Sequence, residues 1–129
     1  MPGSLNKKVL IVEDETPLRT AVADILAFEG FTVFQAKNGL EGLEASLKEH
    51  PDLILLDLMM PVMDGLTMLG KLRQDQEWGK GANVILLTNI SDPEQVARVT
   101  DAGAYDFLVK SDWSIEDVVK KIKTKLGVP

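Results

Sequence analysis

The side chains of this sequence that are best suited to chemistry stand where short apolar runs end. Glu13 and Asp14 follow the run KVLIV, Asp57 closes DLILLD, Thr88 closes NVILLT, and Lys110 closes DFLVK. A charge that closes a buried apolar run is almost never left unpaired, so Asp57 in particular indicates a function. Carboxylates, a hydroxyl and an ammonium group together are typical of phosphoryl-transfer sites.

Three carboxylates in one pocket predict a bound cation. Glu13, Asp14 and Asp57 would repel one another unless a positive charge lay among them. The chain has no cysteine and a single histidine, so the donor set is made of oxygen atoms. Such a set suits a hard ion, Mg²⁺ first and Mn²⁺ second.

A metal of this kind favours phosphate chemistry, and the other side chains agree with it. Lys110 offers a positive charge and Thr88 a hydroxyl donor, both suited to phosphoryl oxygens. Asp57 can then act as the nucleophile that forms an acyl phosphate. The sequence therefore predicts that Asp57 accepts a phosphoryl group at the end of a rigid strand.

These side chains meet only if the apolar runs are strands of one parallel sheet. The runs are short and continuous, as expected for strands that are buried on both faces. They cover residues 8–12, 31–36, 52–57, 83–88 and 106–110. Amphipathic segments alternate with them, which predicts a doubly wound α/β fold that binds ligands at the carboxyl edge of its sheet.

The first and last of the expected helices carry clear boundary signals. Thr16 is the expected N-terminal cap of the first helix, Pro17 fits its first turn, and Gly30 is the expected left-handed stop. At the last helix, Ser114 and Asp117 have the spacing of a capping box.

Three helices in the middle of the chain are less sharply marked, but each is preceded by an N-terminal cap. Asn38, Asp64 and Asp92 each precede a helical segment. The two glycines of segment 77–83 predict an exposed loop. His50 stands at a helix end, where its role is predicted to be structural.

Composition narrows the class of protein. With 129 residues, 45% of them hydrophobic, the chain suits one domain. Acidic residues outnumber basic ones by 20 to 14, and the net charge of −6 would repel nucleic acid and anionic membranes. The absence of cysteine, and of any apolar run near the roughly 20 residues of a membrane span, predicts a cytoplasmic protein.

Taken together, these motifs resemble those of the receiver domains of bacterial two-component response regulators. The motifs are VEDE with Glu13 and Asp14, DLMMPVMDG with Asp57, Pro61 and Gly65, LLT with Thr88, and AGAYDFLVK with Tyr105 and Lys110. The match runs from about Lys7 to the end of the chain. A receiver domain is therefore expected at residues 7–127, with 1–6 as a disordered leader and 128–129 as a tail or the start of a linker.

The resemblance implies a fold and a site. The fold would be a five-stranded parallel sheet in the flavodoxin-like order 2-1-3-4-5. Mg²⁺ would be held by Asp14, Asp57, the backbone carbonyl of Met59 and, through water, Glu13. Lys110 and Thr88 would act beside Asp57 in phosphoryl transfer.

The resemblance also implies partners and an output, and it describes a signalling domain rather than an enzyme. A sensor histidine kinase or a phosphotransfer protein would phosphorylate Asp57. Thr88 and Tyr105 would then move inward and reshape the face formed by the fourth helix, fifth strand and fifth helix. That face would control a downstream protein or output domain, or form a homodimer, without direct contact to nucleic acid or membrane. From the pattern alone, Tyr105 is equally well explained by core packing.

The sequence departs from the family pattern close to the site. Ser111 follows Lys110, where the family usually has a proline in a cis bond, and Asn89 follows the switch threonine, where a small residue is usual. Met59 and Ile90 flank the acceptor with apolar side chains that cannot orient a hydrolytic water. Slow self-dephosphorylation is therefore predicted.

Two alternatives remain open at this stage. The departures at Ser111 and Asn89 are the only support for an inactive, receiver-like adaptor that binds partners without phosphorylation. A flavin carrier or a haloacid-type phosphatase would share the layered fold. The acids of EDETPLR would repel a flavin phosphate, and EDE lacks the Asp-x-Asp spacing of such a phosphatase after the first strand.

Overall fold

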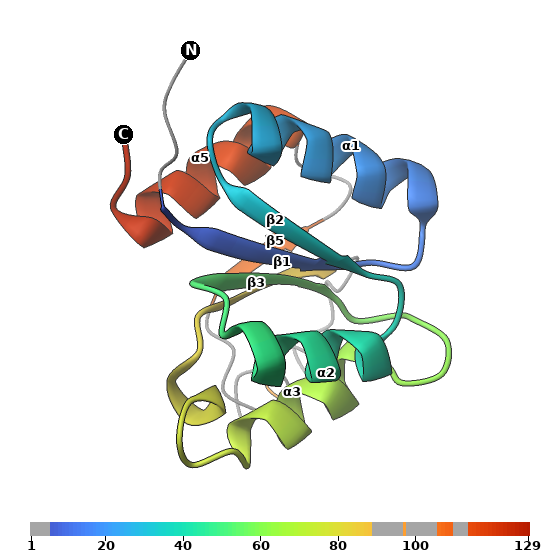
Figure 1. The fold of residues 1–129 in the computed structure, drawn as a ribbon. Helices are drawn as coiled ribbons and strands as arrows, with labels where there is room; N and C mark the ends of the chain where they lie inside the picture. The colour runs from blue at the N-terminus through green and yellow to red at the C-terminus, as the bar shows by residue number, and fades with distance from the viewer. Residues whose placement is uncertain (1–5, 89–96, 98–105, 110–113) are drawn as a thin grey trace.

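The computed structural model of the chain describes residues 6–88, 97, 106–109 and 114–129. Its centre is a parallel sheet of five strands in the order β2-β1-β3-β4-β5, which confirms the predicted fold class (Figure 1). The strands are β1 (Lys8–Val12), β2 (Thr32–Ala36), β3 (Leu53–Asp57), β4 (Val84–Thr88) and β5 (Asp106–Val109). The strand order reverses beside β1, so the crevice between the ends of β1 and β3 is where this topology binds ligands.

Helices cover both faces of the sheet. The chain forms α1 (Thr16–Phe28), α2 (Gly39–Glu49), α3 (Gly65–Arg73), the short 3₁₀ helix η1 (Gly79–Gly81) and α5 (Ile115–Leu126). Helices α1 and α5 lie on one face, and α2 and α3 lie on the other (Figure 1). Strands β1, β2, β3 and β4 contribute alternate side chains to the two faces, because successive residues of a strand point in opposite directions.

Two apolar cores result, one on each side of the sheet. Leu10, Leu56 and Leu86 belong to the core under α2 and α3, whereas Ile11 and Leu55 belong to the core under α1 and α5. All five residues of β3 are buried, including the terminal aspartate. This explains why the sequence of β3 reads as a continuous apolar run rather than as an alternating one.

Three of the predicted helix caps are confirmed. Asn38 Oδ1 accepts a hydrogen bond from the Glu41 amide at 2.8 Å, and Asp64 Oδ1 accepts one from the Thr67 amide at 2.7 Å. Ser114 forms the predicted capping box at the start of α5. The cap predicted at Asp92 lies outside the described residues.

The predicted start of α1 is wrong by one residue. Glu15 is the N-cap and makes no side-chain cap hydrogen bond, while Thr16 is already helical. The Thr16 hydroxyl instead accepts a hydrogen bond from Arg19 within the helix. Pro17 is the second helical residue after this shift. An N–H at that position has no acceptor within the helix, so the proline costs no hydrogen bond. Gly30 follows the helix with a φ of 104°, which confirms its role at the helix end.

The exposed loop predicted at residues 77–83 is in part a folded segment. Asp75 Oδ2 accepts hydrogen bonds from the backbone amides of Trp78 and Gly79, at 2.9 and 2.7 Å, and so folds the chain into η1. Gly79 is buried there. The ring of His50 stacks on Trp78 with centroids 4.7 Å apart, which agrees with the structural role predicted for His50.

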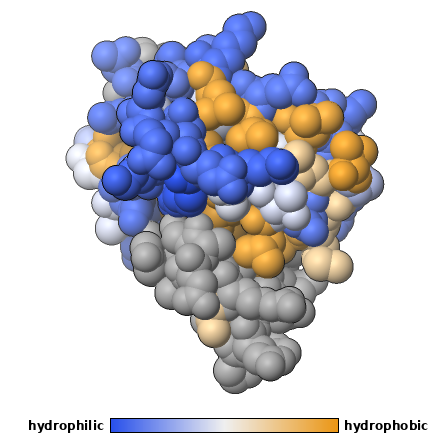
Figure 2. All heavy atoms as spheres, turned by 90° about the horizontal axis from the view of Figure 1, so that it is seen from below, coloured by the Kyte–Doolittle hydropathy of each residue, from blue (hydrophilic) through white to orange (hydrophobic). Residues whose placement is uncertain are grey.

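The outer surface is mixed in character. Seen from the side of α2 and α3, hydrophilic residues predominate and hydrophobic ones lie between them (Figure 2). The large apolar residues that are exposed in the described part of the chain are Phe28, Leu40, Leu47, Met59 and Val62. None of the helices described here is both long and apolar enough to span a bilayer.

Candidate functional site

The strand register brings the predicted acidic residues together. In the parallel pair of β1 and β3, Val12 lies opposite Leu56, so Glu13 and Asp57 follow at the same edge of adjacent strands. The Glu13 amide donates to the Ala36 carbonyl at 3.0 Å, which continues the pairing of β1 with β2 by one residue. The chain leaves the sheet at Asp14 and enters α1.

Three carboxylates converge at this edge. One oxygen from each of Glu13, Asp14 and Asp57 lies within 4.8 Å of the others. Glu13 is fully buried and Asp57 is 3% exposed, whereas Asp14 is the most accessible of the three. The structure thus confirms that the acidic residues expected at the carboxyl edge form one cluster, which opens to solvent on the side of Asp14.

Local hydrogen bonds fix the orientation of the two buried acids. Glu13 Oε2 accepts from the Glu15 amide at 3.1 Å, and the Arg19 guanidinium donates to the Glu13 backbone carbonyl at 2.7 Å. Asp57 Oδ1 lies 3.4 Å from the Met59 amide, which donates to it. These contacts leave the cluster with oxygen atoms close enough to share one small ligand.

The cluster suits a hard divalent cation. Two unit charges about 5 Å apart repel by roughly 3 kcal/mol at an effective dielectric constant of about 20. The three carboxylates carry several such repulsions, which a cation among them would convert into attractions. A donor set made only of carboxylate oxygens fits Mg²⁺ or Mn²⁺ rather than a softer metal.

The remaining predicted site residues are placed only in part. Thr88 ends β4, which is the neighbour of β3, so its backbone lies at the same edge of the sheet as Asp57. Met59 follows Asp57 in the β3–α3 loop and is 82% exposed. The other positions named from the sequence lie outside the described residues: Asn89, Ile90, Tyr105, Lys110 and Ser111.

One contributor to the site was not predicted from the sequence. Arg19 holds the backbone at Glu13 through its contact with the Glu13 carbonyl, and its Nε also donates to Gln35 Oε1 at 3.2 Å. Its place on the first turns of α1 gives no distinctive signal, because surface arginines at such positions are common. Only the turn between β1 and α1 brings its guanidinium back onto the strand end.

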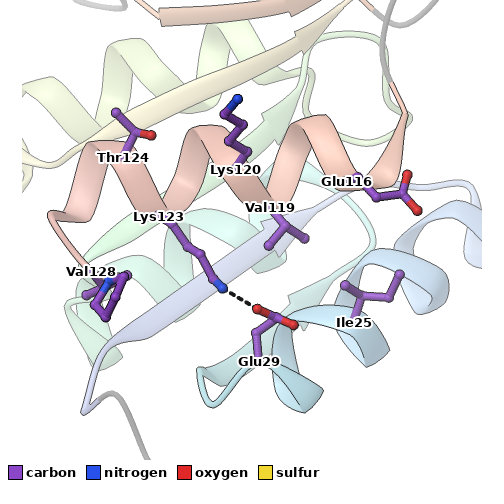
Figure 3. Close-up of a pocket in the computed structure, with 9 residues that line it drawn as sticks. Ile25, Glu29, Glu116, Val119, Lys120, Lys123, Thr124 and Val128 are labelled. Atoms are coloured by element: carbon purple, nitrogen blue, oxygen red, sulfur yellow. Dashed lines mark hydrogen bonds and ion pairs between the residues drawn. The ribbon is translucent and has the colours of Figure 1, made fainter. Parts of the chain in front are cut away.

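A separate groove of about 460 Å³ lies between α1 and α5. Its walls include Ile25, Val119 and Val128, and an ion pair between Lys123 and Glu29 crosses it (Figure 3). None of the three clustered acids lines this groove. The groove is therefore a different surface from the acidic site.

Comparison with known proteins agrees with the geometry of the site. Residues 9–123 match the family model described as "Response regulator receiver domain". The sporulation initiation phosphotransferase F of Bacillus subtilis is 34% identical over 119 residues, which cover 91% of this chain and 94% of that protein. Other curated relatives include transcriptional regulators that are about twice as long as this chain. The match covers 48% of the length of two of them.

Solved structures share the fold. A CheY-like receiver domain protein from Methanospirillum hungatei superimposes with a TM-score of 0.84 at 32% identity, covering 94% of each chain. A chain from the CheX–CheY–BeF₃–Mg²⁺ complex of Borrelia burgdorferi gives a TM-score of 0.80 at 27% identity, covering 92% of this chain and 87% of that one. That complex contains both Mg²⁺ and BeF₃.

Proposed function

This chain belongs to the response regulator receiver family, and on that basis we propose that Asp57 is its phosphoacceptor. A receiver domain is a signalling module of two-component systems rather than a classical enzyme. Phosphoacceptor function is typical of the family, and the acidic pocket of Glu13, Asp14 and Asp57 is present here. The observation that carries the proposal is a carboxylate, 3% exposed, that ends the buried strand β3 within 4.8 Å of two other acids.

In the proposed reaction, an oxygen of Asp57 attacks the phosphorus atom of a phosphohistidine on the donor protein. The new P–O bond gives an acyl phosphate, and the P–N bond breaks so that the imidazole leaves and takes up a proton. Strand β3 holds Asp57 for attack because its backbone is hydrogen-bonded on both sides. The Met59 amide, which already contacts Asp57 Oδ1, orients the carboxylate.

The acidic pocket is the proposed site of Mg²⁺, with Mn²⁺ as a substitute. Asp14, Asp57 and the Met59 carbonyl would hold the ion directly, and Glu13 through water. When bound, such an ion neutralises the charge that develops on the phosphoryl oxygens. Thr88 and Lys110 are proposed to contact the same oxygens, and Thr88 with Tyr105 to form the switch.

The partners follow from the proposed role. Membership of the receiver family implies a kinase or phosphotransfer partner, which we propose to be a sensor histidine kinase or a phosphotransfer protein. The output is proposed to be a change in the face that includes β5 and α5, which binds a downstream protein or output domain, or a second copy. The predicted slow self-dephosphorylation belongs to this proposal, and a phosphorylated half-life of seconds would contradict it.

Intact mass measured after incubation with Mg²⁺ and a small phosphodonor tests the proposal. The wild-type chain should gain one phosphoryl group, whereas Asp57→Asn and an EDTA-treated wild-type sample should gain none. Asp52→Asn is a matched control, because Asp52 lies next to the other end of β3 and contacts the Lys8 amide there. Folded wild-type protein that gains no mass would refute the phosphoacceptor role and favour the adaptor alternative.

A further inference from the structure

Two helices that frame the site begin with glycines in equivalent positions. Gly39 is the first residue of α2 and follows the cap Asn38, and Gly65 is the first residue of α3 and follows the cap Asp64. The N–H of a first helical residue has no acceptor within its own helix. Both of these N–H groups instead donate to carbonyls in residues 58–64, the segment that we call the acceptor loop.

The two hydrogen bonds hold opposite ends of the acceptor loop. Gly65 N–H donates to the Leu58 carbonyl at 2.9 Å and so closes the loop at its start. Gly39 N–H donates to the Met63 carbonyl, also at 2.9 Å, and so ties the end of the loop to a different helix. Residues 39 and 63 are distant in sequence, and α2 reaches the loop only because α2 and α3 pack side by side (Figure 1).

Neither glycine has room for a side chain. A Cβ atom at Gly39 would lie 2.3 Å from the Met63 carbonyl oxygen, and one at Gly65 would lie 2.2 Å from the Asp57 carbonyl oxygen. Gly42, one turn further along α2, differs in kind, because a Cβ there would meet side-chain atoms of Val12 and Met68 at 2.8–2.9 Å. The Met68 sulfur ends a flexible side chain and can adjust, whereas the Val12 methyl groups are stiff, so a clash at Gly42 falls on the core. A clash at Gly39 falls on a backbone carbonyl, which moves only if the loop moves.

The acceptor loop needs such external support because its own conformation is strained. Val62 has a φ of 68°, a left-handed conformation that is a genuine outlier for a β-branched residue. Its side chain is 77% exposed, so packing contributes little to holding it there. The next residue, Met63, is the one that Gly39 anchors.

We propose that Gly39 is a positioning residue for the phosphorylation of Asp57. Its close approach to Met63 fixes the acceptor loop, and the loop in turn fixes Met59, whose amide contacts Asp57 Oδ1 at 3.4 Å. A side chain at position 39 displaces the loop and with it the orientation of the acceptor carboxylate. This inference rests on the proposed function of Asp57, and it adds α2 to the elements that position the Asp57 carboxylate.

The first test compares two glycine variants in the same helix. Gly39→Ala should lower the phosphorylation rate at saturating Mg²⁺ by about tenfold or more, because a displacement of about 1 Å can cost about 100-fold in rate. Gly42→Ala, which clashes with core side chains and not with the loop, should keep the rate within about twofold when corrected for its folded fraction. Equal rates in both variants, whether normal or reduced, would overturn the inference.

A second test uses the wild-type protein, in case Gly39→Ala does not fold. Coupling between two sites is reciprocal, so a clamp that positions the acidic site must be tightened when Mg²⁺ binds there. Amide hydrogen exchange at Gly39 should therefore slow by several-fold on addition of Mg²⁺. The Gly42 amide, which donates to the Asn38 carbonyl within α2, is the internal control and should change less. An unchanged rate at Gly39 while Mg²⁺ binds would overturn the inference.

The two proposals fail in different ways. If the wild-type chain gains no phosphoryl group, the phosphoacceptor role of Asp57 is wrong, and the exchange measurement still decides whether the clamp is coupled to the acidic pocket. If the wild-type chain is phosphorylated and Gly39→Ala is phosphorylated equally fast, only the role of Gly39 is wrong.

Discussion

The two edges of the sheet use polar residues in opposite ways. At the carboxyl edge, Glu13, Asp14 and Asp57 bring like charges within 4.8 Å of one another. At the amino edge, Asp75 accepts two backbone hydrogen bonds from the start of η1, and Arg73 donates to the carbonyls of Gly79 and Ala82 at 2.8 and 2.7 Å. The first arrangement favours ligand binding over stability, whereas the second favours stability.

Each edge of the sheet also has a residue in a left-handed backbone conformation, and the two residues differ in how well that conformation is supported. His50 has a φ of 47°, but it is the left-handed cap of α2, its amide donates to Ser46, and its ring stacks on Trp78. Val62 has a φ of 68° in an exposed loop beside the acceptor. Histidine adopts this conformation more readily than a β-branched residue does. The strain at Val62 therefore lies beside the site, and it is tolerated because hydrogen bonds from the neighbouring helices hold the loop.

Truncation of Trp78 should have the largest effect on stability. Trp78 packs against the core under α2 and α3 and stacks on His50. Because the indole is only partly buried, Trp78→Ala should lower the free energy of unfolding by about 2–4 kcal/mol, slightly less than at a fully buried site. Urea denaturation measures this loss, and Trp78→Phe should recover part of it. The phosphorylation rate of the folded protein should stay within about twofold, and a large fall would show that the two edges are coupled.

Neutralising one acid of the cluster should increase the free energy of unfolding, by less than Trp78→Ala lowers it. In EDTA at low ionic strength, Asp57→Asn should raise the free energy of unfolding by about 1–2 kcal/mol, because it removes repulsion from Glu13 and Asp14. Excess Mg²⁺ should narrow the difference, since an ion that binds the native wild-type chain stabilises it. Denaturant titrations with and without Mg²⁺ measure both effects. A less stable Asp57→Asn in EDTA would mean that the contacts of Asp57 outweigh the repulsion.

The sequence was informative where structure depends on neighbouring residues or on general rules of topology. Asn38 and Asp64 are recognisable as caps because a cap is a local contact: the side chain accepts from the amide three residues later. Buried parallel strands read as continuous apolar runs, and the convergence of Glu13 with Asp57 follows from the rule that ligands bind at the carboxyl edge. These features needed no knowledge of side-chain packing.

The features that the sequence did not reveal depend on particular long-range or side-chain contacts. The approach of Gly39 to the Met63 carbonyl is a backbone contact between two helix-loop units, and a glycine at a helix start looks the same without it. Segment 77–83 reads as a loop because its glycines give no sign that Asp75 folds it into a 3₁₀ turn. The sequence does not determine whether α1 begins at Thr16 or one residue later, because threonine suits both a cap and a first helical residue.

The smallest predicted effect concerns pH and the amino edge. The backbone amide of Gly79, then that of Trp78, and then the charge of His50 lower the pKa of Asp75 below its usual value of 3.8, although partial burial opposes this. Because the folded pKa is the lower one, the stabilisation is complete above about pH 5 and is lost as the pH falls below about 4, through the folded pKa.

Asp75→Asn removes this dependence, so the stability difference between the two proteins should be constant from pH 7 to about pH 5 and shrink toward pH 3. Urea denaturation at each pH measures that difference. Added salt should leave most of this pH dependence in place. Its main cause is the hydrogen bonds to the Asp75 carboxylate, and salt screens only the contribution of His50. A difference that instead grew on acidification would mean that folding raises the pKa of Asp75, and that the backbone amides of Gly79 and Trp78 do not stabilise its charged carboxylate.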